Sequence, residues 1–275
     1  MPMAREEAVS GQFYPSDASE LRKDVIGYIG NNKRSSAKPY GIIVPHAGYS
    51  FSGRTAGYAF NALSGKKADT FIIIGTNHSS SETSLSLEDF KTPLGVAKND
   101  RRFSEELVKL GIEVNERDHA FEHSIEVEIP FLQALFKDVR IVPIAASFSD
   151  FDECKRFSEK IVKTIEKLGR KACIIASGDF THFGTYYGYN PFKATRSKIY
   201  AIDKKAIDLI SDLKAKEFFE YAKSTTICGA SSISAGVETC RRLGARKATL
   251  VNYANSGDLT KDYENCVSYA SWVIE

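Results

Sequence analysis

The sequence has no long apolar run, no excess of charge of one sign and no pairing pattern among its cysteines. No stretch approaches the roughly 18 apolar residues that a membrane helix requires. The first residues carry charge without an apolar core, so we expect no secretory signal. The 37 basic and 35 acidic residues leave a net charge of +2, and this balance favours neither nucleic acid nor a membrane as a partner.

The cysteines are few and scattered. There are five of them, an odd number, widely spaced and without a C-x-x-C motif. Such a distribution is typical of free thiols in a reducing compartment rather than of a disulfide framework, so we expect a cytoplasmic protein. The chain also has no internal repeat and no low-complexity tract, and we expect residues 1–275 to form a single domain.

Apolar runs alternate with segments of helical periodicity along the chain. The runs lack a polar face, which is typical of strands covered on both sides. Strands are predicted over residues 40–44, 70–74, 139–144, 172–177, 247–253 and 266–274. Helices are predicted over about 16–29, 53–63, 100–110, 150–168, 193–213, 215–223 and from 229 to 243. This alternation predicts an α/β fold with a mostly parallel central sheet flanked by helices.

Three segments give weaker signals. Residues 31–38 are polar and rich in lysine, and we expect a linker there. Residues 84–96 predict short strands or a loop excursion. Between 118 and 133 the apolar positions recur at helical spacing, and Pro130 predicts that regular helix starts or kinks close to it.

Three of the predicted strands run into a histidine within a few residues. His46 follows the first strand, His78 the second, and His182 the strand that ends at Ser177. Taken singly, each is more often a surface or hydrogen-bonded core residue. In an open α/β sheet, however, ligands bind in the loops beyond the carboxyl ends of the strands. Because imidazole suits iron, copper, zinc and nickel, the joint pattern predicts a metal site at one edge of the sheet.

The residues alone leave the remaining ligand open. Asp179, near His182, is either a ligand or a carboxylate that orients a histidine ring. Glu126 and Glu128 are further candidates, although acidic residues near the start of a helix are often simply favourable there. Cys228 precedes a predicted helix whose N-terminus would favour the thiolate, and its alternative is a small buried hydrophobe.

Several uncommon motifs, in order over nearly the whole chain, resemble those of the MEMO family. They are Phe13-Tyr14-Pro15, Pro45-His46-Ala-Gly-Tyr49, Gly75-Thr-Asn-His78, Glu122-His123-Ser-Ile-Glu126, Ser177-Gly-Asp179-Phe-Thr-His182, Thr226-Ile-Cys228-Gly and Leu250-Val-Asn252-Tyr. Prokaryotic members are also called AmmeMemoRadiSam system protein B, because they co-occur with a radical-SAM protein and an AMMECR-type protein. The resemblance implies a functional link to those proteins and a fold similar to LigB-type class III extradiol dioxygenases.

Carried over position by position, the resemblance implies that His46, His78 and Cys228 bind a metal. Fe(II) is the first metal we expect. Copper is the second, because a thiolate in place of a carboxylate softens the site, and zinc stays open as a third.

The resemblance also implies that His182, His123 and Asp179 line the same pocket as catalytic residues. A neutral imidazole at His182 or at His123 could accept and pass on a proton near pH 7. Tyr49 and Glu126 are expected to contribute to the substrate pocket, although a tyrosine is as often ordinary packing.

Two departures from the animal members of the family are visible. Ala230-Ser-Ser stands where they carry Arg-His-Pro, and Ser79 replaces a second histidine after His78. The metal ligands survive both changes, whereas a substrate contact or an auxiliary ligand need not. We therefore expect a metal-dependent oxidoreductase of unknown substrate. The alternative is a non-catalytic adaptor that uses the dioxygenase-like pocket to bind a peptide or a small molecule, since animal members bind phosphotyrosine peptides.

Overall fold

The computed structural model describes residues 4–30 and 39–275, so the linker expected over 31–38 lies outside the described residues. Within them the strands are β1 Ala4–Arg5, β2 Gly41–Val44, β3 Thr70–Thr76, β4 Ser84–Leu85, β5 Asp89–Thr92, β6 Gly95–Asn99, β7 Glu113–Val114, β8 Arg140–Ala146, β9 Ala172–Ser177, β10 His182–Gly184, β11 Ala248–Asn255 and β12 Asn265–Ile274. The helices of the same ranges are α1 Ala18–Ile29, α2 Tyr49–Asn61, α3 Arg101–Lys109, α4 Glu116–Ala120, α5 His123–Glu126, α6 Ile129–Leu135, α7 Phe151–Leu168, α8 Arg196–Ser211, α9 Ala215–Lys223, α10 Ala230–Arg242 and α11 Ser256–Thr260.

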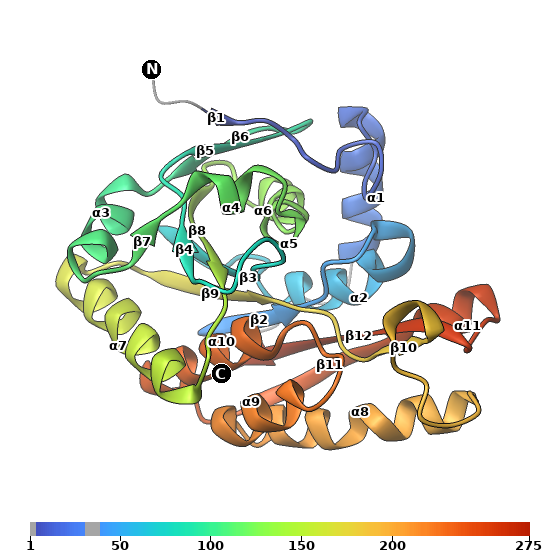
Figure 1. Ribbon diagram of the computed structural model, residues 1–275. Coiled ribbons are helices and arrows are strands. Elements are labelled where there is room, and N and C mark those ends of the chain that lie inside the picture. Colours follow the sequence, from blue (N-terminus) through green and yellow to red (C-terminus); the bar gives the residue numbers. More distant parts are fainter. Residues whose placement is uncertain (1–3, 31–38) are drawn as a thin grey trace.

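A single twisted sheet runs through the molecule (Figure 1) in the order β1-β5-β6-β8-β3-β9-β2-β12-β10. The central strands β8, β3, β9 and β2 are parallel to one another and almost wholly buried. Their unbroken apolar sequences fit this burial, because a parallel sheet is covered on both faces. β12 pairs antiparallel with β2 and with β11. The predicted α/β fold with a mostly parallel sheet is confirmed.

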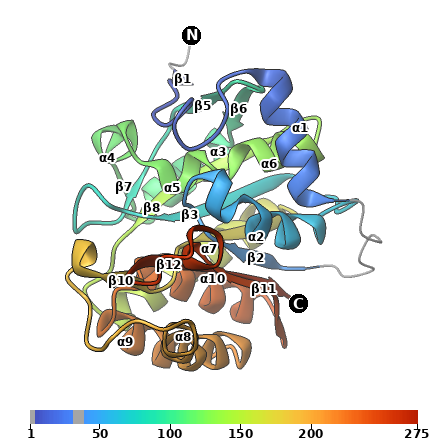
Figure 2. The same ribbon diagram turned by 90° about the vertical axis from the view of Figure 1, so that its right-hand side faces the viewer.

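Helices cover both faces of the sheet. One apolar core lies between the sheet and α1, α2 and α6, and a second lies between the sheet and α7, α9 and α10. Figure 2 shows α1, α2 and α6 above the sheet, with α8, α9 and α10 below it. The loops after β2, β3 and β9 therefore open between two layers of helices.

The main differences from the sequence prediction lie where helices begin. Helix α2 starts at Tyr49 rather than near residue 53. The stretch 118–133 is divided among three short helices, and α6 begins at Ile129, next to Pro130, as predicted. Glu122 caps α5 by accepting the N–H of Ser124, and Pro130 sits in the first turn of α6, where its missing N–H costs nothing. Residues 84–99 form the short strands β4, β5 and β6.

The close packing of α1 against α2 depends on Gly57. A Cβ at this position would lie 2.3 Å from the carbonyl oxygen of Tyr28, a backbone atom that cannot move aside easily. Gly57→Ala is therefore expected to lower the free energy of unfolding by about 1–3 kcal/mol in urea denaturation. Gly27→Ala, on the facing helix, is the matched control. Nothing lies within 4 Å of its added methyl, so it should stabilise by about 0.5–1 kcal/mol. Equal changes in the free energy of unfolding of the two variants would contradict the close contact at Gly57.

A candidate metal centre at the strand ends

The histidines expected to converge come from loops that follow neighbouring strands. His46 follows β2, His78 follows β3, and His182 lies five residues beyond Ser177, the last residue of β9. β9 pairs in parallel with both β2 and β3, so these loops leave the sheet side by side at one edge. All three histidines line one cavity there.

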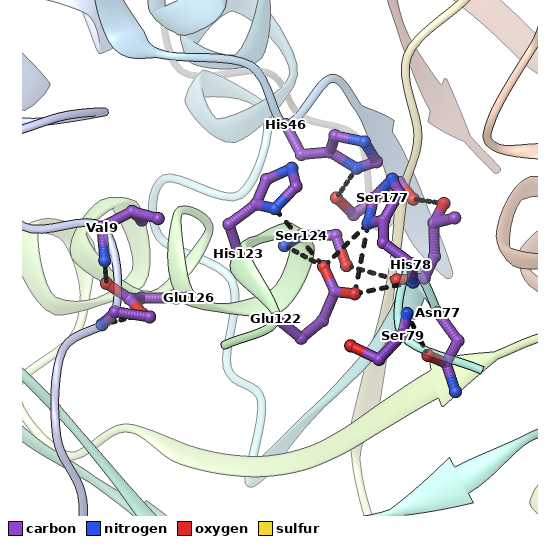
Figure 3. Close-up of polar contacts among 12 residues, drawn as sticks. Val9, His46, Asn77, His78, Ser79, Glu122, His123, Ser124, Glu126 and Ser177 are labelled. Atoms are coloured by element: carbon purple, nitrogen blue, oxygen red, sulfur yellow. Dashed lines mark hydrogen bonds and ion pairs between the residues drawn. The ribbon is translucent and has the colours of Figure 1, made fainter. Parts of the chain in front are cut away.

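The tightest cluster of metal-ligand atoms joins His46, His78 and His123. Each offers a ring nitrogen, and these nitrogens lie within 4.8 Å of one another. Figure 3 shows the three rings close to one another, with dashed lines from the Glu122 carboxylate to His78 and His123 and from His46 to Ser177. His123 does not follow a strand: it is the first residue of α5, which packs against the end of β3. The cluster at the strand ends therefore includes a histidine, His123, that the pattern of strands followed by histidines did not predict.

Hydrogen bonds fix one nitrogen of each of two rings. Nδ1 of His46 lies 3.1 Å from Oγ of Ser177, and Nδ1 of His78 lies 3.0 Å from Oε1 of Glu122. A carboxylate or hydroxyl partner on Nδ1 leaves Nε2 as the free nitrogen, an arrangement common among metal-binding histidines. Both side chains are thus prepared to bind a cation through Nε2.

Glu122 is the main site residue that the sequence analysis gave no role. Its carboxylate accepts the backbone N–H of His78 at 2.9 Å in addition to the ring contact. Burial opposes its ionisation, but the hydrogen bonds from His78 and Ser124 outweigh this and lower the pKa of Glu122 to about 2. In turn, Glu122 raises the pKa of His78 against the opposing effect of burial. The one available signal was its position directly before His123.

Cys228 lies beside this cluster. Its Sγ is 3.2 Å from Nε2 of His46 and accepts the N–H of Asp179 at 3.3 Å. Burial raises the pKa of the Cys228 thiol above its ordinary value. Two donors that share one tetrahedral ion lie about 3.5 Å apart, given usual bond lengths of about 2.0 Å to nitrogen and 2.3 Å to sulfur. The distance between Cys228 and His46 is compatible with one shared ion, whereas the three ligand atoms that lie within 4.8 Å of one another come from His46, His78 and His123.

Asp179 and His182 stand at the same cavity in different roles. Asp179 accepts the backbone N–H of His46 at 2.8 Å, and burial raises the pKa of its carboxyl to about 7. Nδ1 of His182 lies 3.0 and 3.1 Å from the carbonyl oxygens of Phe180 and Thr226. Because carbonyls only accept, Nδ1 of the neutral ring carries the proton and Nε2 keeps its lone pair. Burial lowers the pKa of His182, which favours this neutral form.

The cavity has a volume of about 440 Å³ and is partly aromatic. Phe13, Phe51, Tyr187 and Tyr269 contribute rings to its wall, together with the four histidines and Asp179. Of the described residues, none that lines it is a lysine or an arginine. The side chains of this wall therefore include aromatic rings, imidazoles and one carboxyl group.

The two residues expected in the substrate pocket lie elsewhere. Tyr49, the first residue of α2, is buried in the apolar core, and its hydroxyl donates to the carbonyl of Val127 at 2.6 Å. Glu126 is fully buried and binds Arg5, Tyr14 and the N–H groups of residues 8 and 9. Neither lines the cavity. Both sequence expectations are corrected, because these polar groups are satisfied inside the protein.

The fold and the site define an α/β protein with three histidines, at the carboxyl ends of parallel strands, that could hold a metal ion. The family model described as Memo-like protein matches residues 5–273. This chain belongs to the MEMO family, as its motifs predicted.

Archaeal relatives match over their full length. A MEMO1 family protein of Methanosarcina barkeri is 36% identical and covers 98% of this chain and 100% of its own. One of Pyrococcus abyssi is 34% identical and covers 99% of each chain. Among solved structures, an uncharacterized protein of Escherichia coli K12 covers 76% of this chain and 86% of its own, at 12% identity and a TM-score of 0.46. Among the described residues, no helix is long and apolar enough to cross a membrane.

Proposed function

We propose that this chain is a cytosolic metal-dependent oxidoreductase. The observation that carries the proposal is the geometry of His46 and His78. Each has its Nδ1 held by a protein group, and the two rings meet at the strand ends beside a third imidazole and a thiol. Such donors suit iron and copper, and zinc also accepts them.

The ligands we propose are His46, His78 and Cys228, with Fe(II) first and copper second. The contact between Cys228 and His46 supports this choice, since 3.2 Å suits two atoms that bind the same ion. His123 competes for the third position, because its ring nitrogen belongs to the tightest cluster. We assign His123 to the reacting side of the site, where it lines the cavity.

When bound, the metal would supply Lewis acidity and redox chemistry toward dioxygen and an oxygen atom of the substrate. The protein would supply proton transfer and shape. His182 offers the lone pair of Nε2 to a substrate proton while the Phe180 and Thr226 carbonyls hold its ring in place. Asp179 holds the His46 backbone, and its raised pKa also allows it to carry a proton near neutral pH.

The alternative of a phosphopeptide adaptor receives no support from the cavity. Phosphate recognition relies on arginine or lysine side chains, and the described lining residues include neither. A peptide with an uncharged side chain in the cavity would remain compatible with this wall.

Metal analysis tests the proposal directly. Wild-type protein purified without added metal is expected to contain stoichiometric iron or copper, and Cys228→Ser is expected to contain much less. After cobalt substitution, the wild type should show thiolate-to-cobalt charge-transfer absorption that Cys228→Ser lacks and His123→Ala keeps. Cys266→Ser, at a buried thiol outside the cluster, is the matched control. A protein that takes up no metal, with Cys228→Ser indistinguishable from wild type, would exclude the oxidoreductase.

A further inference from the structure

Glu128 is a buried acid that the proposed mechanism does not use. The sequence offered it as a candidate ligand, but it lies behind His46 rather than in the cavity. Its side chain has no exposure to solvent. Oε1 accepts the hydroxyl of Ser177 at 2.9 Å, and Oε2 has no hydrogen-bond partner among the described residues. An unpaired buried carboxyl oxygen is costly and calls for an explanation.

Ser177 connects this acid to the proposed metal ligand. Its Oγ lies 2.9 Å from Oε1 of Glu128 and 3.1 Å from Nδ1 of His46. A hydroxyl has one proton to donate. If that proton goes to Glu128, Oγ can only accept from His46, and the ring must then carry its proton on Nδ1. The direction of the first hydrogen bond therefore determines which tautomer the second allows.

The opposite side of the ring favours the same tautomer. Nε2 of His46 lies 3.2 Å from Sγ of Cys228. In the metal-free protein an S–H of Cys228 can donate to a lone pair on Nε2. The same lone pair is the one that a metal would use. The contacts on both sides of the ring are thus compatible with a proton at Nδ1.

We propose that Glu128 is a positioning residue that turns the Ser177 hydroxyl away from His46, and so keeps Nε2 of His46 unprotonated for the metal. This inference rests on the proposed metal site. Glu128 acts as a hydrogen-bond acceptor, which requires only a lone pair on Oε1. The carboxyl has this lone pair when it is ionised and also when its proton sits on Oε2. Charge is therefore not needed, although burial raises the pKa of Glu128 well above its usual range.

Two substitutions at this position separate an acceptor from a space-filling residue. Glu128→Gln can present its amide oxygen to Ser177 and its NH₂ where Oε2 stands. Glu128→Leu fills a similar volume without an acceptor, which leaves the Ser177 hydroxyl free to donate to Nδ1. Cobalt affinity of the metal-free protein is expected to fall roughly 10–100-fold in the Leu variant, the usual effect of losing a partner of a metal-binding histidine. The Gln variant should stay close to wild type.

The tautomer gives a readout that does not require metal. ¹⁵N NMR of histidine-labelled, metal-free protein is expected to show the His46 proton on Nδ1 in wild type and Glu128→Gln. In Glu128→Leu a substantial share should move to Nε2. His46 with its proton on Nε2 in the wild type, or a Gln variant that behaves like Leu, would overturn the proposal. Wild type that binds no cobalt but shows the expected tautomers would instead count against the proposed function alone.

A double-mutant cycle tests the route through Ser177. In a Ser177→Ala background the chain of hydrogen bonds is already broken, so Glu128→Leu should have no further effect on cobalt affinity. A full effect in that background would mean that Glu128 acts on the fold, and the proposal would fail. If Glu128→Leu does not fold, Ser177→Ala alone tests the proposal. Its cobalt affinity is expected to be roughly tenfold lower than that of the wild type, and adding Glu128→Gln should not lower it further. Asp203→Asn, at another fully buried acid that does not contact His46, is the matched control.

Discussion

Arg5→Met is expected to lower the free energy of unfolding by about 3–5 kcal/mol, the effect of removing one partner from a buried ion pair. Arg5 is only 5% exposed, and its guanidinium pairs with the carboxylate of the fully buried Glu126. It also donates to the carbonyl oxygens of His119 and Glu122, at 2.6 and 2.7 Å. The substitution would leave a buried charge and two buried carbonyls with fewer partners.

Urea denaturation of three variants measures this effect. Lys91→Met removes an ion pair with Glu6 that is exposed to solvent, and it should cost far less stability than Arg5→Met. The double variant Arg5→Met/Glu126→Leu should not recover the lost stability, because it also leaves the Tyr14 hydroxyl and the N–H groups of residues 8 and 9 without their acceptor. A similar small cost for Arg5→Met and Lys91→Met would contradict the role we give to Arg5.

The N-terminal segment therefore supports the candidate metal site in addition to stabilising the fold. Arg5 holds the carbonyl of Glu122, whose side chain orients His78. Phe13 packs on the ring of His123, with 4.9 Å between the ring centres, and lines the cavity. Loosening this segment is expected to weaken metal binding in addition to stability.

The sequence could predict the parts of the site that depend on local pattern. Apolar runs marked β2, β3 and β9, and in a parallel sheet the residues after such runs must share one edge. That argument requires only the order of elements along the chain. It therefore located His46 and His78 correctly at the edge of the sheet.

The remaining parts depend on contacts between segments far apart in the chain. Glu126 pairs with a residue 121 positions away, and no local pattern indicates such a partner. His123 reaches the cluster because α5 packs against Gly75 at the end of β3, where a Cβ would lie 2.3 Å from Oγ of Ser124. Tyr49 was misplaced because α2 begins four residues earlier than predicted and turns this ring inward.

His78→Ala is expected to reduce metal affinity by more than about 100-fold. The lower limit on this loss of affinity follows from the role of Glu122, which would not contact the metal but holds Nδ1 of His78. Losing such a partner costs about 10–100-fold, so losing the ligand itself must cost more. Glu122→Gln is expected to fall in that lower range, because an amide oxygen can still accept one N–H but no longer carries the charge.

His182→Ala separates metal binding from the rest of the cavity. Its Nδ1 is held by carbonyl oxygens and its ring is outside the tightest donor cluster, so the variant should bind cobalt or iron like wild type. Titration of the metal-free proteins under anaerobic conditions compares the three variants. An equal loss in His182→Ala and His78→Ala would count His182 among the ligands together with His78 and would contradict the proposed ligand set. The expected order of affinities is His78→Ala weakest, then Glu122→Gln, then His182→Ala. It follows from the place of His78 in the three-histidine cluster and from the contact of Glu122 with His78.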